Sequence, residues 1–463
     1  MFKAKAMDED LCAVFVHAGA GYHSRENEKR HLLVCEMAAE AGMEFLRRGG
    51  NAVDAVETAI MMLENAPITN AGFGSNVNEK GVVECDASIV DHFGRSGAVG
   101  AVANVRNPIQ LARVVYEKAH QSAGLSRVPP NFLCGEGAQE FAWDHGIILV
   151  PNEAMVAPIA NIRYHNWKHD INQWNLRNPP TEAEARFRWM RPASQPERYP
   201  GLRDRLEAAR LITPVQMPSS RGDDEEEPID GLNRKDETTA NRANSSNHGL
   251  HDNDRTPPPD FTDFKDSKPN NPTDGEDWIT DTVGAIVVDQ FGNIAAGSSS
   301  GGIGMKHRGR IGPAALIGIG THVLPMDPTD ANGTSVAVVA SGTGEHIASS
   351  FAASTCAQRI YYSQRMGNGG IFEDVTEEEA IAAMLQNEFS SHPAILNSNI
   401  DGSLGLMAVK KTEDGIGLYF AHNTESFALA SFSNKDKRPQ CVMSRNPNKA
   451  PVALGGLMIR PTQ

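Results

Sequence analysis

The chain has 463 residues, and its 43 basic and 58 acidic side chains give a formal net charge of −15. No apolar run approaches the roughly 18 residues that a membrane-spanning helix needs, so no membrane partner is expected. The negative balance argues against a nucleic-acid partner held by bulk charge. The six cysteines lie scattered, with no CxxC pair and no histidine cluster, which argues against a disulfide scaffold and a metal site.

Residues 11–150 are expected to form a globular α/β unit. Residues 11–16 (LCAVFV) are an apolar run typical of a buried strand, and the following HAGAGY segment is expected to break it. Apolar side chains recur at helical spacing in 30–48 and again in 52–65. Asn51 is a suitable N-cap for the second of these helices.

The middle of the chain changes in composition. The stretch 160–213 contains spaced arginines and lysines and a possible helix at 181–193, so it is interpreted as a helical, basic segment. From 214 to 277 the sequence is poor in aliphatic side chains and holds the acidic run 223–227. Such a composition cannot bury enough apolar surface to offset the entropy of ordering, so the sequence predicts a disordered acidic loop here.

Residues 282–463 return to a globular composition. The apolar runs 282–289 and 335–340 are typical of buried strands. The segments 344–366 and 377–389 predict helices, the second with three glutamates in its first turn.

The junction Asp281-Thr282, where the acidic loop meets a buried strand, has chemistry of its own. A threonine hydroxyl there can attack the preceding carbonyl, and an N→O acyl shift followed by hydrolysis would leave Thr282 as a new first residue. Its α-amine, with an ordinary pKa near ~8, would then serve as base for its own hydroxyl. Taken alone, an Asp-Thr pair is more often an ordinary start of a strand, so self-cleavage is one hypothesis of two.

Several segments in one order favour the catalytic hypothesis. The segments DTVGAIVVD, GNIAAGSSSGGIGMKHRGRIGPAALIG and ASGTGEH follow the junction, and VFVHAGAGYHS, TNAGFGSN and ECDASI precede it. Together they resemble the N-terminal-nucleophile hydrolases of the plant-type asparaginase family, and within it the taspase (threonine aspartase) group most. The resemblance covers about 11–150 and 278–463. It implies a four-layer αββα sandwich in the α/β class, made of an α subunit (1–281) and a β subunit (282–463) that assemble as a dimer of αβ units.

The resemblance also implies catalytic roles. Thr282 matches the nucleophile, and Asp281 matches the residue whose peptide bond is cut during maturation. Ser300 matches a second hydroxyl beside the nucleophile. Ser341 and Gly342 match the pair that supplies oxyanion donors, a function that typically contributes ~3 kcal/mol for each donor.

Substrate binding is implied in the same way. Arg310 matches the arginine that binds a substrate carboxylate, a task for which a planar guanidinium is well shaped, and Gly19 and Asn70 match residues that line the site. Asparaginases of this family carry an acidic residue three positions after that arginine, where it holds the α-ammonium of the substrate. Here that position is Pro313, which cannot hold a cation. A peptide-bonded aspartate has no free amine, so we expect a threonine endopeptidase that cuts protein substrates after aspartate.

Each of these residues also has an ordinary structural explanation that involves no catalysis or substrate binding. An arginine such as Arg310 in a glycine-rich turn is most often a solvated charge, and Ser300 and Ser341 are ordinary turn or cap hydroxyls. His17 and His23 flank the first glycine turn and could support the site or lie at the surface, so neither is counted among the site residues.

Two alternatives to the endopeptidase stay open: an asparaginase or isoaspartyl peptidase on the same fold, and an unprocessed, non-enzymatic scaffold. No cofactor and no metal is expected. By resemblance the substrates would be nuclear regulators of transcription and chromatin, and the location nucleus and cytoplasm. The spaced basic residues of 160–213 form no tight cluster, so charge alone does not indicate nuclear import.

Overall fold

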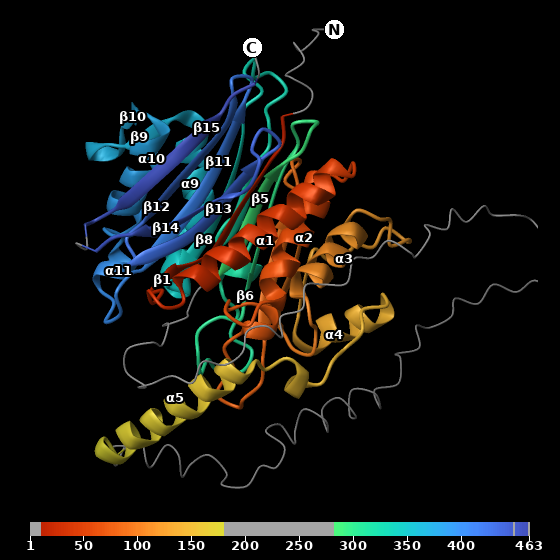
Figure 1. The fold of residues 1–463 in the computed structure, drawn as a ribbon, viewed down its shortest axis with the longest axis vertical. Coiled ribbons are helices and arrows are strands. Elements are labelled where there is room, and N and C mark those ends of the chain that lie inside the picture. The colour runs from red at the N-terminus through yellow and green to blue at the C-terminus, as the bar shows by residue number, and fades with distance from the viewer. Residues whose placement is uncertain (1–10, 180–281, 448–449, 462–463) are drawn as a thin grey trace, which may run out of the picture. The chain divides into compact units, whose positions relative to one another are not determined.

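Two stacked β-sheets organise the chain in this computed structural model, which describes residues 11–179, 282–447 and 450–461 (Figure 1). The larger sheet has eight strands in the order β14-β13-β1-β5-β6-β2-β3-β4, and the smaller has five in the order β15-β12-β11-β8-β7. The eight strands are β14 (Gln440–Arg445), β13 (Ser426–Ser433), β1 (Ala13–Gly21), β5 (Val283–Val288), β6 (Ile294–Ser300), β2 (Cys85–Val90), β3 (Ser96–Val102) and β4 (Phe132–Cys134). The five are β15 (Ala453–Ile459), β12 (Gly415–His422), β11 (Leu404–Thr412), β8 (Ser335–Gly342) and β7 (Thr321–Leu324).

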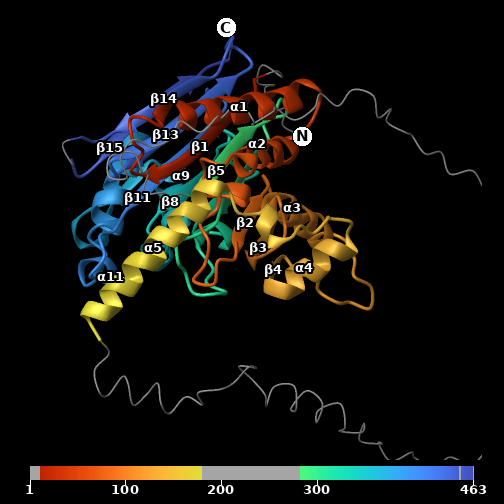
Figure 2. The same cartoon turned by 60° about the horizontal axis from the view of Figure 1, so that its bottom comes forward.

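Helices cover the outer face of each sheet. Figures 1 and 2 show α1, α2 and α3 against the eight-stranded sheet, while α9 and α10 lie against the five-stranded one. The helices are α1 (Glu28–Arg47), α2 (Ala52–Asn65), α3 (Pro108–Ala119), α4 (Gly135–Asp144), α5 (Pro158–Arg177), α8 (Gly344–Ser350), α9 (Ala352–Tyr362), α10 (Glu377–Ala383) and α11 (Pro393–Leu396). Short turns are η1 (Gly72–Gly74), η2 (Asn152–Ala154), η4 (Pro313–Ala315), η5 (Asn368–Gly370) and the π-helical η6 (Met384–Phe389); β9 (Gln364–Met366) and β10 (Phe372–Asp374) form a hairpin.

Burial of both faces explains why β5 is apolar along its whole length. In β5, Ala285 and Val287 lie in the core under the helices, whereas Ile286 and Val288 lie in the core between the two sheets. Both faces of the strand are therefore buried. The predicted four-layer αββα sandwich is confirmed, because each sheet has helices on one side and the other sheet on its second side.

Most predicted elements are present, with two corrections. The helix at 52–65 is α2, and Asn51 and Asp54 form the capping box at its start. The HAGAGY segment does not break the first strand, since β1 runs to Gly21 and absorbs the glycines in a register shift between His17 and Ala20. The predicted helix at 344–366 is also wrong in length, because Phe351 adopts a left-handed backbone with φ of 50° and separates α8 from α9.

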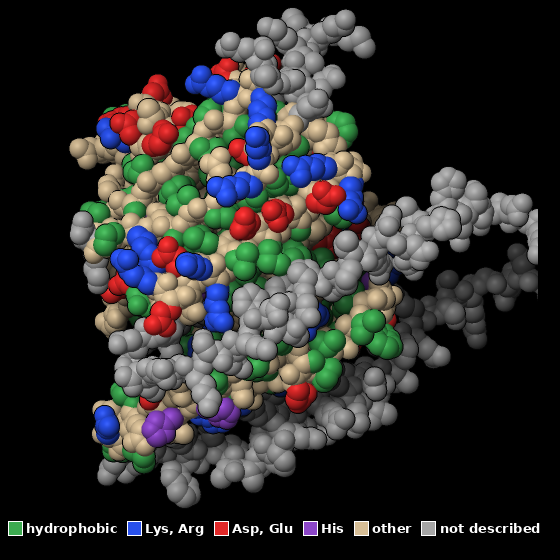
Figure 3. Space-filling model, in the orientation of Figure 1, with side chains coloured by type: hydrophobic (Ala, Val, Ile, Leu, Met, Phe, Trp, Pro, Cys, Tyr) green, Lys and Arg blue, Asp and Glu red, His purple; other side chains and the backbone are tan. Residues whose placement is uncertain are grey.

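The middle of the chain is described only in part. Of the predicted basic segment 160–213, the part up to 177 lies in α5, while the possible helix at 181–193 and the predicted acidic loop at 214–277 lie outside the described residues. Within the described ranges, no helix is long and apolar enough to cross a membrane. On the face seen in Figure 3, acidic and basic side chains of the described residues are interspersed and gather into no patch of one sign.

Candidate active site

Thr282 lies immediately before β5, in the layer between the two sheets. Its side chain follows the alternation of Ile286 and Val288, which face the five-stranded sheet. The residue is 4% exposed, and its backbone N–H donates to Ser341 Oγ at 3.2 Å. A hydroxyl-bearing residue is thus buried at the edge of the core, and its main-chain nitrogen is held from the neighbouring sheet. Asp281, the other partner of the expected cleavage, lies outside the described residues.

Two serines reach the same place from neighbouring strands. Val283 of β5 pairs with Ser299 of β6, so Ser300 lies beside Thr282 in the sheet. The Ser300 hydroxyl accepts a hydrogen bond from the Gly302 N–H at 3.0 Å. Ser341 comes from β8 in the other sheet, and its hydroxyl accepts from Ala20 N at 3.0 Å as well as from Thr282 N. Such a hydroxyl still has its own O–H to donate.

Glycines allow the backbone to close around these hydroxyls. Gly19 sits in the register shift of β1 with φ of 109°, and Gly342 follows Ser341 with φ of 142°. A Cβ on Gly342 would overlap the carbonyl oxygen of Ser403. Both predicted site glycines are therefore required by the local backbone, whatever part they take in catalysis.

Asn70 supports the turn that follows Ser300. Its Nδ2 donates to the Gly302 carbonyl at 2.8 Å, and its backbone carbonyl accepts from Gly301 N at 2.8 Å. Its Oδ1 accepts from Asn76 N at 2.9 Å. The contacts of Asn70 thus fix the geometry of the turn, which makes it a positioning residue.

Arg310 is held by an acidic partner that the sequence did not suggest. Its Nε and Nη2 donate to Glu345 Oε1 at 3.0 and 2.9 Å. Its third nitrogen, Nη1, lies 3.0 Å from where a Cβ of Gly302 would stand, and Gly302 has a φ of 73°, so the turn beside the guanidinium favours glycine. The side chain is 15% exposed and lies between the turn after Ser300 and the start of α8.

A buried aspartate and a buried lysine, Asp86 and Lys306, lie close to Arg310. Asp86, directly opposite Ser300 in the sheet, accepts hydrogen bonds from Ala101 N and Gly312 N, each at 2.8 Å. Burial raises the pKa of its carboxyl, and the positive charge of Lys306 counteracts that effect. Lys306 is 2% exposed and donates to the Glu84 carbonyl at 2.7 Å. The only signal in the sequence was a single aspartate within an apolar strand, too common a feature to single out.

His17 is also buried beside the candidate site. It lies opposite Gly284 in the β1–β5 pairing, and a Cβ on Gly284 would overlap its Nε2. Within the described residues neither ring nitrogen has a hydrogen-bond partner, and burial lowers the pKa of His17 to about 3. His23 is buried too, with Nδ1 2.8 Å from Ser426 Oγ. The surface alternative for these two histidines is therefore wrong.

Pro313 begins η4 and packs against the start of α8. Its Cδ lies 2.8 Å from the position that a Cβ of Gly344 would take. Because a proline ring carries no charge and no hydrogen-bond acceptor, Pro313 cannot bind a substrate ammonium group through its side chain. The nearby acceptor is the Glu345 carboxylate, whose side chain is 59% exposed.

The converging groups suit acyl transfer to a hydroxyl. Three hydroxyl-bearing residues, Thr282, Ser300 and Ser341, lie close together, and the Arg310 guanidinium, a group suited to binding a carboxylate, lies beside the turn that follows Ser300. Among the described residues, no group of three or more His, Cys, Asp or Glu side chains is placed to hold a metal ion.

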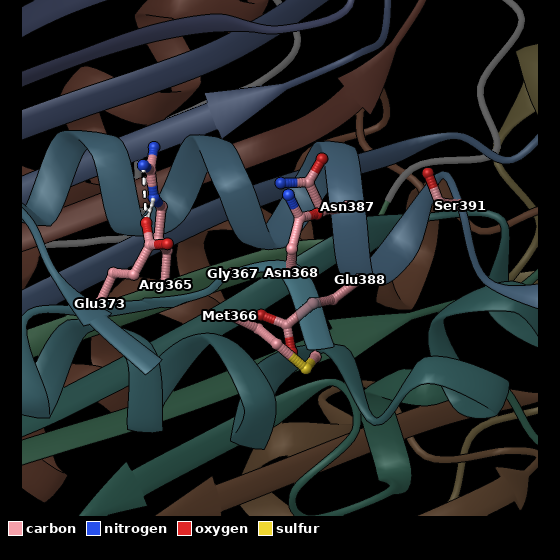
Figure 4. A pocket seen from close by; sticks show the side chains of 8 residues that line it. All are labelled: Arg365, Met366, Gly367, Asn368, Glu373, Asn387, Glu388 and Ser391. Atoms are coloured by element: carbon pink, nitrogen blue, oxygen red, sulfur yellow. Dashed lines mark hydrogen bonds and ion pairs between the residues drawn. The ribbon is translucent and has the colours of Figure 1, made fainter. Parts of the chain in front are cut away.

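A separate cavity of about 480 Å³ lies on the outer layer of the five-stranded half (Figure 4). Its lining includes Arg365, bound to Glu373, and Glu388 of the π-helical turn η6. None of the candidate catalytic or substrate-binding residues lines this cavity.

Comparisons with known proteins agree on a family. The family model for asparaginase (Asparaginase_2) matches residues 11–189 and 226–388. An isoaspartyl peptidase/L-asparaginase of Danio rerio is 41% identical over 164 residues, 35% of this chain and 48% of that protein. A probable isoaspartyl peptidase/L-asparaginase 2 of Arabidopsis thaliana is 29% identical over 335 residues, 71% of this chain and 76% of that protein. An isoaspartyl peptidase of Salmonella typhimurium is 27% identical over 355 residues, 75% of this chain and 79% of that protein. The chain thus spans about half of the first of these relatives and over three quarters of the other two.

Proposed function

Because the chain belongs to the Asparaginase_2 family of N-terminal-nucleophile hydrolases, we propose that it is an isoaspartyl peptidase/L-asparaginase with Thr282 as its nucleophile. This reverses the order of the two enzymatic interpretations, since the relatives named above carry asparaginase and isoaspartyl peptidase names. The observation that carries the proposal is the position of Thr282, buried between the sheets with its main-chain nitrogen on Ser341.

The nucleophile is made by a cut in the chain. The Thr282 hydroxyl attacks the carbonyl carbon of Asp281, the C–N bond breaks, and an ester joins Asp281 to the Thr282 oxygen. Water then hydrolyses the ester, which leaves a carboxylate on Asp281 and a free amine on Thr282. That amine is the same nitrogen that donates to Ser341 Oγ at 3.2 Å, which supports its retention beside the hydroxyl that it activates.

The amine then serves turnover as a base. It takes the hydroxyl proton while the oxygen attacks the side-chain carbonyl of the substrate, and ammonia or a peptide amine leaves as an acyl-enzyme forms. Water hydrolyses this ester and releases aspartate. Arg310 holds the substrate α-carboxylate, and the hydroxyl of Ser341 is one hydrogen-bond donor available to the developing oxyanion.

A second candidate is the taspase-like endopeptidase that cleaves protein substrates after aspartate. Pro313 favours it, because a peptide-bonded aspartate needs no acceptor for an α-ammonium. In this orientation Arg310 would hold the aspartate side chain and the α-carbonyl would face Thr282. Nuclear regulators as substrates, a nuclear and cytoplasmic location and a dimer of αβ units are part of this candidate.

One substrate panel separates the candidates. The full chain is incubated with L-asparagine, with a β-aspartyl dipeptide and with a peptide that contains an internal aspartate. We expect ammonia from the first and aspartate from the second, with the third intact. Cleavage of the internal-aspartate peptide without ammonia release would overturn the proposal in favour of the endopeptidase, and no turnover of any of the three would favour the scaffold.

A further inference from the structure

We propose that Asn368 is a site of spontaneous deamidation, a modification that is separate from the proposed activity and replaces an amide by a carboxylate in the outer cavity of the five-stranded half. The sequence holds two Asn-Gly dipeptides, Asn332-Gly333 and Asn368-Gly369. In such a dipeptide the backbone nitrogen after the asparagine reaches the asparagine side chain with little steric hindrance, because glycine has no Cβ. The structure holds these two dipeptides differently, so one serves as the control for the other.

The modification needs no catalyst and only water as a co-reactant. The backbone nitrogen of Gly369 attacks the side-chain carbonyl carbon of Asn368, a new C–N bond closes a succinimide ring, and the bond from that carbon to the side-chain nitrogen breaks. The proton from the Gly369 N–H leaves with this nitrogen, which is released as ammonia. Water then opens the ring at either of its carbonyls. One opening gives aspartate with the original backbone, and the other gives isoaspartate, in which the chain continues through the side chain.

The two reacting groups at Asn368 have no hydrogen bond that holds them apart. Asn368 and Gly369 are both exposed. In the part of the chain that the structure describes, no hydrogen bond reaches the Asn368 side chain or the Gly369 N–H. Gly369 and Gly370 have φ of 74° and 79°, a left-handed backbone that glycine adopts without steric cost. The nitrogen of Gly369 can therefore turn toward the side chain without first breaking a hydrogen bond.

The second Asn-Gly pair is held by its surroundings. Asn332 is exposed as well, so exposure does not separate the two sites. The Gly333 N–H, however, donates to the Asp330 carbonyl at 3.2 Å, and the Asn332 carbonyl accepts from Glu413 N at 2.9 Å. The Asn332 N–H also donates to Asp330 Oδ1 at 2.9 Å. These bonds must open before the Gly333 nitrogen can attack, and each opening reduces the population that reacts.

Deamidation would add negative charge to a cavity that already holds two glutamates. Asn368 lines the cavity of about 480 Å³ together with Arg365, Glu373 and Glu388 (Figure 4). Arg365 is already paired with Glu373 at 2.8 Å, and Glu388 accepts from Arg359 through both of its oxygens at 2.8 and 2.7 Å. The new carboxylate would therefore lie among charges that are already paired, and its charge would be added to the cavity.

Peptide mapping by mass spectrometry tests the proposal. The full-length protein is incubated at mildly alkaline pH, and deamidation at both Asn-Gly pairs is followed over time with a fragmentation method that distinguishes aspartate from isoaspartate. We expect Asn368 to deamidate about tenfold faster than Asn332, because opening the hydrogen bonds at Asn332 reduces its reactive population by about that factor. The same protein unfolded in urea is the control, since both sites should then react at similar rates.

The Asn368→Gln variant shows whether the reaction belongs to this residue. The longer glutamine side chain closes the corresponding ring much more slowly, so the mass increase of the peptide that spans position 368 should disappear, while Asn332 reacts as in the wild type. Persistence of that increase in the variant would overturn the proposal. Equal rates at Asn332 and Asn368 in the folded protein would overturn it too, as would an Asn368 that keeps its amide in the folded protein while both sites react in urea.

Discussion

Burial of His17 predicts a specific loss of stability in mild acid. The folded protein holds the imidazole neutral with a pKa of about 3, against 6.5 when exposed, so the unfolded chain takes up a proton first as the pH falls. The stabilising effect is present in full above pH 6.5 and is lost progressively as the pH drops toward 3. Each pH unit in that interval costs about 1.4 kcal/mol, so the free energy of unfolding should fall by about 2.7 kcal/mol between pH 6.5 and about pH 4.5 from this group alone.

The His17→Phe variant isolates this effect, because it keeps an aromatic ring against Phe427 but cannot take up a proton. Both proteins are made with Thr282→Ala, so that the chain stays in one piece, and urea unfolding is followed by circular dichroism across the pH range. As the pH falls over the stated interval, the free energy of unfolding of the protein with His17 should decrease by about 2.7 kcal/mol relative to that of the His17→Phe variant. His120→Phe, which removes an exposed histidine, is the control. Curves for wild type and His17→Phe that stay parallel over the whole range would refute the reasoning.

Three further substitutions test the site directly. Thr282→Ala should abolish both chain cleavage and substrate turnover, while Thr282→Ser should retain part of each because the hydroxyl survives; mass spectrometry would contradict this if a fragment beginning at residue 282 formed from the alanine variant. Ser341→Ala removes the acceptor for two N–H groups, those of Ala20 and Thr282, and should lower the free energy of unfolding by about 1–3 kcal/mol together with kcat, a prediction that fails if urea midpoint and kcat are both unchanged. Gly284→Ala places a Cβ against the buried His17 ring and should lower the melting temperature, with retention of the wild-type value counting against the packing described.

The sequence could predict those parts of the fold whose signals are local. The apolar runs at 282–289 and 335–340 are β5 and β8, since strands buried on both faces need no polar alternation. The helix predicted at 52–65 matches α2 at both ends, because Asn51 caps its start and Pro67 follows shortly after its end. The break at Phe351 had no such mark, because a left-handed aromatic residue carries no glycine or proline signal.

Site residues could be predicted only where their side-chain chemistry and a recognisable sequence motif both pointed to catalysis. The resemblance assigned Thr282, Ser300 and Ser341 to one site. The register of β5 against β6 places Ser300 beside Thr282, and the hydrogen bond from Thr282 N places Ser341 there too. Glu345 escaped prediction, because its contact with Arg310 spans 35 positions and depends on how α8 approaches the turn at Gly312. Pairings of this range arise from tertiary packing, which no local pattern encodes.

The order of strands in the large sheet bears on what a cut before Thr282 would do. β1 lies between β13 and β5, both of which come later in the chain, while β6 is joined to β2 from the earlier part. If the chain were cut at that point, strands of the two pieces would alternate within one sheet. Main-chain hydrogen bonds would join the pieces between β1 and β13, between β1 and β5, and between β2 and β6. The two pieces would separate only when the sandwich unfolds, so a chain cut there would behave in solution as one folding unit built from two polypeptides.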